Sequence, residues 1–344
     1  MYSSKDTENQ SLAEQESKNF NMAISFPVRF WIFLISLIPS FVCYVFALWH
    51  LLCDRVLRGT LSNHTIILLL IINLIYELIN IPLYLSYFYH FGNVFPSTPN
   101  VCLFWIFIDE GLFSISLLIF VWATVERYII IFHKKSISTW KGRALFHYSP
   151  LIILFIYLFL FFSFTVIFPP CKNTFEYDAP ICGFPVGYYD VKLVGIWDVL
   201  FHDISPVVVM AVFNVVLFFR VILRKRRWTQ LIEWGKYRKM AIQLLSISAL
   251  YFFLHIPDMI LTLGTFSGAH ISFSDVFDTY TKFFSTYTTF LLPFASAVSL
   301  PILKTKLKNL YPYRFQPKRL HSMTIEFNRG TDARQINALL PMVN

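Results

Sequence analysis

Seven apolar runs, each long enough to cross a bilayer as a helix, constrain the fold of this chain more than any other feature. A helix needs about 20 residues to cross the hydrocarbon core. The runs cover residues 30–52, 66–88, 103–132, 145–168, 194–223, 240–263 and 277–300. Only 14% of the residues are charged, against about a quarter in soluble domains. The sequence therefore predicts an all-α integral membrane protein, a seven-helix bundle over residues 29–310 with tails at 1–28 and 311–344.

The distribution of Lys and Arg between the runs predicts the orientation, because cytoplasmic loops of membrane proteins carry an excess of both. Loops on the side of the N-terminal tail carry five of them, and loops on the other side carry 22. We therefore expect an extracellular N-terminus and a cytoplasmic C-terminus. The net charge of +9 follows from this topology and not from a nucleic-acid surface. Asn9 begins a glycosylation sequon on the expected outer side.

The third run begins with Cys102 and ends with the triplet Glu126-Arg127-Tyr128. The 25 residues from Cys102 to Arg127 span about 37 Å as a helix, which is one tilted crossing. Arginine is costly in hydrocarbon, so we expect Arg127 at the cytoplasmic edge with Glu126 as its partner. Cys102 then lies at the outer mouth, where the compartment is oxidising.

This spacing and triplet resemble the third helix of rhodopsin-like (class A) G-protein-coupled receptors, and the resemblance extends over all seven runs. Prolines stand at the family's kink positions, namely Pro82, Pro206, Pro257 and Pro293. After Pro301, the basic and apolar-striped residues 302–310 look like the family's short amphipathic helix. Among the outer cysteines, the resemblance implies a Cys102–Cys182 disulfide, with Cys171 free or an alternative partner.

The chain also departs from the family pattern, so it resembles a divergent member, such as one of an expanded invertebrate set. Asn73 and Leu292 replace two polar residues that help to hold an internal sodium ion in the family. His255 replaces the tryptophan associated with activation, and Asn214 and Ser296 replace two tyrosines. The resemblance implies a multi-pass receptor of the plasma membrane. It would bind an extracellular ligand and activate a heterotrimeric G protein through Glu126, Arg127 and Tyr128.

Asp109 is expected in the outer part of the bundle. It precedes Arg127 by 18 residues, or five helical turns, so the two share one face about 27 Å apart. In amine receptors of the family, this aspartate position pairs with the ligand ammonium. The side chains expected around one outer cavity are Asp109, Glu110, Phe113, Asp198, His202, Asp203, His255, Asp258 and Lys282. Five acids against one lysine favour a cationic ligand, an amine or the basic end of a peptide.

Several alternatives remain open from the sequence. An internal ion-pair network, with Lys282 bonded to Asp109 or Asp258, would need no ligand. A seven-span transporter or channel, or a receptor-like protein that no longer signals, would also fit seven spans. We find no catalytic motif and expect neither an enzyme nor a cofactor or metal. His133 and His147 are interpreted as loop residues without paired ligands.

Overall fold

The computed structural model describes residues 24–133, 137–169, 171–183, 187–224, 231–267 and 275–297. These residues form helices and connecting segments, and none of them is in a strand. Asn9, Pro301, the expected amphipathic helix at 302–310 and the tail at 311–344 lie outside the described residues.

Six helices in the described part of the chain are long and apolar enough to cross a membrane. They are α2 (Phe26–Cys53), α4 (Leu61–Tyr89), α5 (Pro99–Phe132), the helix Trp140–Ile167, the helix Lys192–Arg220 and α11 (Leu231–Ser267). The seventh expected run also forms a helix, α12 (Asp275–Ala297), but α12 is not one of the six. The protein is therefore an all-helical, multi-pass membrane protein by length and composition, with six such helices shown.

Two of the six helices contain π-helical segments. Trp140–Ile167 consists of α7 (Trp140–Arg143), a π-helical turn (Ala144–Tyr148), α8 (Ser149–Phe162) and a second π-helical turn (Ser163–Ile167). The other begins with α9 (Lys192–Asp198), widens into a π-helical segment (Val199–Ile204) and continues as α10 (Ser205–Arg224). Pro206 has no N–H for the carbonyl four residues earlier, and the helix widens over the turn before it.

Short helical segments complete the description. These are α3 (Arg55–Arg58) and two 3-10 turns, Pro180–Cys182 and Gly187–Asp190. Pro82, Pro257 and Pro293 lie inside α4, α11 and α12, as the spacing predicts for membrane helices.

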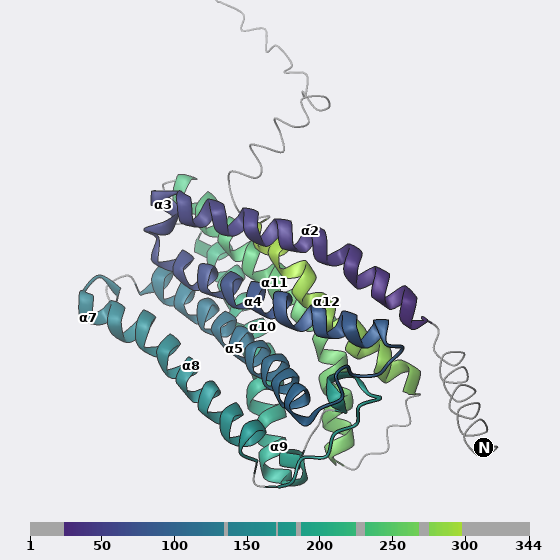
Figure 1. Cartoon of the computed structure of the whole chain (residues 1–344). Helices are drawn as coiled ribbons and strands as arrows, with labels where there is room; N and C mark the ends of the chain where they lie inside the picture. Colours follow the sequence, from purple (N-terminus) through teal and green to yellow (C-terminus); the bar gives the residue numbers. More distant parts are fainter. Residues whose placement is uncertain are drawn as a thin grey trace, which may run out of the picture. The chain divides into compact units, whose positions relative to one another are not determined.

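Neighbouring helices pack side by side (Figure 1), and their contacts place α5 in the middle of the bundle. α4 packs on α2 and α5, while α5 also contacts α8 and α10. α12 packs on α11 and α2, so the last described helix returns to the first.

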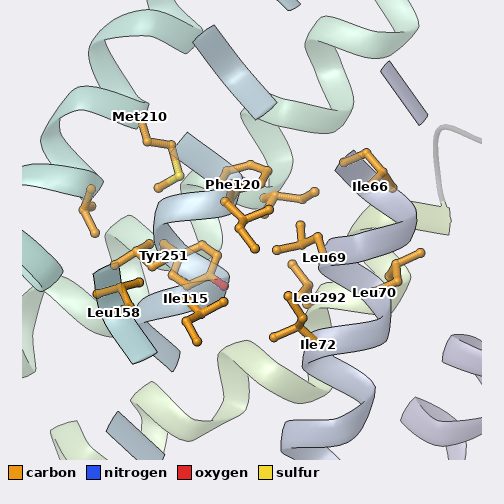
Figure 2. Close-up of a cluster of buried hydrophobic side chains, with 14 of the residues drawn as sticks. Ile66, Leu69, Leu70, Ile72, Ile115, Phe120, Leu158, Met210, Tyr251 and Leu292 are labelled. Atoms are coloured by element: carbon orange, nitrogen blue, oxygen red, sulfur yellow. The ribbon is translucent and has the colours of Figure 1, made fainter. Parts of the chain in front are cut away.

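The buried core is apolar and draws on most helices (Figure 2). Phe120 of α5 stacks on Tyr251 of α11 with 6.0 Å between ring centroids, and Leu69, Met210 and Leu292 come from three further helices. Large apolar side chains such as Trp31, Ile153 and Phe253 are exposed instead. An apolar exterior around an apolar core is what a bilayer requires, because lipid rather than water surrounds the helices.

Candidate functional site

A disulfide joins the N-terminal end of α5 to the segment before α9. Cys102, at the start of α5, is bonded to Cys182, with 5.6 Å between the Cα atoms. This is the pair that the family resemblance implies, and Cys171 is a free, half-buried cysteine. Gly183 follows in a left-handed conformation (φ 75°), and a Cβ there would lie 2.7 Å from the Cβ of Glu176. The turn that presents Cys182 to α5 therefore needs glycine at this position.

Asp109 is buried but points to the neighbouring helix α4. Its Oδ1 accepts a hydrogen bond from the Tyr76 hydroxyl at 2.8 Å and another from the Asn80 amide. The Oδ1 of Asn80 in turn accepts from the Trp105 indole N–H at 2.8 Å. A buried carboxylate needs a partner, and α4 supplies it here. A ligand cation is therefore not required to stabilise Asp109. Lys282, which the sequence offers as an alternative partner, has an exposed side chain.

Asp198 and His202 belong to a second network in which the carboxylate of Asp198 is fully engaged. Its Oδ2 accepts hydrogen bonds from Tyr188 (2.8 Å) and Tyr189 (2.9 Å), and its Oδ1 lies 2.6 Å from His202 Nδ1. The other ring nitrogen of His202 lies 2.9 Å from the hydroxyl of Tyr157. This arrangement ties Asp198 and His202 into the bundle as structural contacts, although the sequence analysis placed both at the ligand.

The two tyrosines keep their protons in this network. Burial first, and then the nearby charge of Asp198, raise the pKa of the Tyr188 and Tyr189 hydroxyls well above the ordinary value for tyrosine. Both hydroxyls are therefore donors at neutral pH, and the two hydrogen bonds to Asp198 are those of a phenol to a carboxylate.

Glu110 and Asp203 differ from Asp109 and Asp198 in their surroundings. The charged groups that act on them are other carboxylates. Glu110 interacts electrostatically with Asp109, Asp198, Asp203 and Asp258, and Asp203 interacts with Asp198 and Asp258. Within the described ranges, neither Glu110 nor Asp203 has a hydrogen bond or an ion pair. Asp203 is only 6% exposed. Mutually repelling, buried carboxylates are stabilised by a proton or by a cation.

His255 and Phe113 lie one helical turn deeper than Asp258 and Glu110, respectively, on α11 and α5. Their ring centroids are 4.4 Å apart. His255 is 5% exposed, and neither of its ring nitrogens has a hydrogen-bond partner in the part of the chain that the structure describes. The two side chains form an aromatic pair between α5 and α11, one helical turn from the acids.

The closest polar contacts of Glu126 are with residues of other helical segments, while its charge also acts on the neighbouring guanidinium of Arg127. Its Oε2 accepts from the Thr65 hydroxyl at 2.6 Å, and its Oε1 lies 2.7 Å from His147 Nδ1. Adjacent residues of a helix point in different directions, so side chains at i and i+1 do not face each other. His147 is also not a loop residue: it is 1% exposed in the π-helical turn before α8.

Arg127 and Tyr128 lie near the C-terminal end of α5. Arg127 is 2% exposed, and its Nε and Nη1 atoms have no hydrogen-bond partner among the described residues. Tyr128 contacts α10, because its hydroxyl accepts a hydrogen bond from Arg220, whose guanidinium also lies 5.2 Å from the centre of the Tyr128 ring. The three side chains of the triplet therefore lie in different environments. Glu126 contacts Thr65 and His147, Tyr128 contacts Arg220, and Arg127 is buried.

The polar centre of the bundle was partly missed by sequence reasoning. The amide of Asn73 donates to Ser116 Oγ at 2.6 Å, and Ser116 lies 3.5 Å from the hydroxyl of Tyr251. These contacts join α4, α5 and α11 at the position where the family resemblance would place an ion. Tyr76, Asn80 and Thr65 were also missed. Their only signal in the sequence is a polar side chain within an apolar run.

Comparison with known proteins adds no family assignment. No family model matches the chain, and no curated protein is significantly similar to it.

Proposed function

We propose that this protein is a divergent rhodopsin-like receptor of the plasma membrane, in which a cationic extracellular ligand activates a heterotrimeric G protein. The observation that carries the proposal is the organisation of α5. One end of this helix is joined by a disulfide to the segment before α9, and its other end holds the buried, incompletely bonded guanidinium of Arg127. In this proposal α12 is the seventh span, the N-terminus is extracellular and the C-terminus is cytoplasmic.

The proposed ligand contact lies at Glu110 and Asp203 and not at Asp109. Asp109 already accepts two hydrogen bonds from α4, whereas the charged groups that act on Glu110 and Asp203 are other carboxylates. A ligand ammonium or guanidinium between them would remove this repulsion. His255 and Phe113, one turn deeper, would contact the ligand's apolar part, since such sites combine apolar walls with a few polar anchors.

Signal transfer would run through α11. Asp258, His255 and Tyr251 lie on this helix, and Tyr251 stacks on Phe120 of α5. A ligand that binds α5 and α11 more tightly in one arrangement shifts the equilibrium toward that arrangement, and only by its differential affinity. The inner end of α11 would then move relative to Arg127 and open the surface for the G protein.

The deciding experiment expresses the full chain at a cell surface and measures G-protein activation against a panel of amines and short basic peptides. Activation by a member of the panel, lost in the Arg127→Ala variant, supports the proposal. An ion current or substrate uptake without G-protein activation would instead identify a transporter or channel. Surface expression with neither response would identify a receptor-like protein that does not signal.

A further inference from the structure

Glu77, in the middle of α4, is a fully buried acid that the proposed function does not use. Its side chain has one hydrogen bond within the described part of the chain: the hydroxyl of Ser40 in α2 donates to its Oε2 atom at 2.7 Å. The Oε1 atom is buried and has no hydrogen-bond partner among the described residues. Glu77 also makes no ion pair with any of them.

Within the described helices, the groups around Glu77 supply no positive charge. On α2, the titratable side chains that interact electrostatically with it are the thiol of Cys43 and the hydroxyl of Tyr44. On α5, the acid that contacts α4 at the adjacent Tyr76 is Asp109, whose carboxylate accepts two hydrogen bonds from α4. α12 packs on both α2 and α4, and its buried polar side chains are hydroxyls, namely Thr281, Thr286, Thr288, Thr289 and Ser296.

A carboxyl group in these surroundings is stable only without charge. An ionised carboxylate is costly to bury unless a cation or several donors compensate it. Ser40 is a single neutral donor, so Oε1 of an ionised Glu77 would keep its negative charge without a partner. The bilayer around the helices supplies neither water nor a counter-ion at this depth. A neutral carboxylic acid avoids the cost, because one oxygen accepts from Ser40 and the other carries the proton.

We propose that Glu77 is a proton-binding site inside the bundle, and that its bound proton allows α2 to pack against α4. The site also lies close to α12. Tyr44 follows Ser40 by one helical turn on the same face of α2, and its hydroxyl donates to the backbone carbonyl of Thr289 at 3.1 Å. Loss of the proton from Glu77 places an uncompensated charge where α2, α4 and α12 meet. This inference concerns the packing of the bundle and goes beyond the proposed receptor function.

The first test measures the melting temperature of the purified full chain in lipid nanodiscs against pH, beside Glu77→Gln, whose side chain does not titrate. The folded chain binds the proton of Glu77 more tightly than the unfolded chain, in which glutamate ionises at about pH 4.3. The stability that the proton contributes is therefore greatest in acid and is lost as the pH rises. We expect the melting temperature of the natural chain to fall with rising pH relative to that of Glu77→Gln. Glu176→Gln, at an exposed acid, is the matched control and should leave the pH dependence of the natural chain unchanged.

The second test detects the proton by infrared spectroscopy. A neutral carboxylic acid has a C=O stretching band at higher frequency than a carboxylate, and the band shifts when O–H is exchanged for O–D. We expect the natural chain at neutral pH to have such a band that is missing from both Glu77→Gln and Glu77→Met. Ser40→Ala should keep the band and change its frequency, because it removes the hydrogen bond to Oε2 but not the proton.

An ionised Glu77 predicts the opposite results. A natural chain that gains stability over Glu77→Gln as the pH rises would overturn the inference, and so would two identical pH profiles or the absence of the infrared band. Failure of both Glu77→Gln and Glu77→Met to fold would also overturn it, because a neutral side chain is what the site is proposed to hold. None of these measurements needs a ligand or a G protein, so they decide the inference whether or not the proposed receptor function is correct.

Discussion

The hydroxyl of Tyr76 lies 2.8 Å from the Oδ1 atom of Asp109, and this contact joins α4 to α5. The amide of Asn80 donates to the same oxygen. This pairing changes the role of Asp109, which sequence spacing assigns to the ligand. In the structure, its contacts are those of a residue that holds two helices together.

We predict that Asp109→Ala lowers the melting temperature of the purified protein. The change leaves the buried Tyr76 hydroxyl and Asn80 amide without this acceptor, at a cost of about 1–3 kcal/mol for each. Tyr76→Phe in the same chain removes one of the stranded donors and should restore part of the loss. A melting temperature that Asp109→Ala does not change would show that the contact contributes nothing to stability.

Neutralising Glu110 or Asp203 should weaken binding of the amine or basic peptide that activates the receptor. If the charge pair is buried, Glu110→Gln or Asp203→Asn costs about 2–5 kcal/mol in affinity. The measurement is displacement of a labelled ligand on intact cells. Glu176→Gln, an exposed acid of the outer segment, is the matched control and should leave affinity unchanged. Equal affinity in all three variants would exclude this acidic site as the ligand contact.

Arg127→Ala should abolish G-protein activation and leave surface expression close to that of the natural chain. The structural reason is that Nε and Nη1 of Arg127 make no hydrogen bond among the described residues, so the substitution leaves no partner of these two atoms unsatisfied. Arg55→Ala, at an exposed arginine, serves as the comparison for loss of charge alone. Activation that persists in Arg127→Ala would remove the central residue of the proposed mechanism.

The Cys102–Cys182 disulfide predicts how cysteine substitutions affect surface expression. Cys102→Ser and Cys182→Ser should each reduce surface expression, and the double variant should be no worse than either, because all three lack the same bond. Loss of a disulfide typically costs about 2–4 kcal/mol. Cys171→Ser should have little effect, since Cys171 is a free cysteine. A clear defect in Cys171→Ser would point to an alternative pairing.

The proposed orientation is tested at both tails. Glycosidase treatment should increase the electrophoretic mobility of the natural chain but not of the Asn9→Gln variant, because the sequon would face the lumen during synthesis. An epitope added at the C-terminus should be stained only after cells are permeabilised. Staining of that epitope on intact cells would reverse the topology.

The helices and their order could be predicted from the sequence because each depends on local information. A run of apolar residues is stable in lipid only if its backbone bonds internally, so length and composition are sufficient to place α2, α4, α5 and α11. The run 277–300 also becomes a helix, α12, with polar residues such as Thr288 and Thr289 buried within the bundle.

The partners of the buried polar groups were decided only by the tertiary structure. Asp109 bonds to Tyr76, 33 residues away, and Glu126 bonds to Thr65, 61 residues away. Such pairs depend on the rotation and the height of one helix against another, and these are set by packing across the whole core. The pattern within one apolar run is compatible with many such arrangements. Sequence alone therefore located the acids of α5, while packing determined that Asp109 and Glu126 accept hydrogen bonds from other helices and that Glu110 lies near other carboxylates.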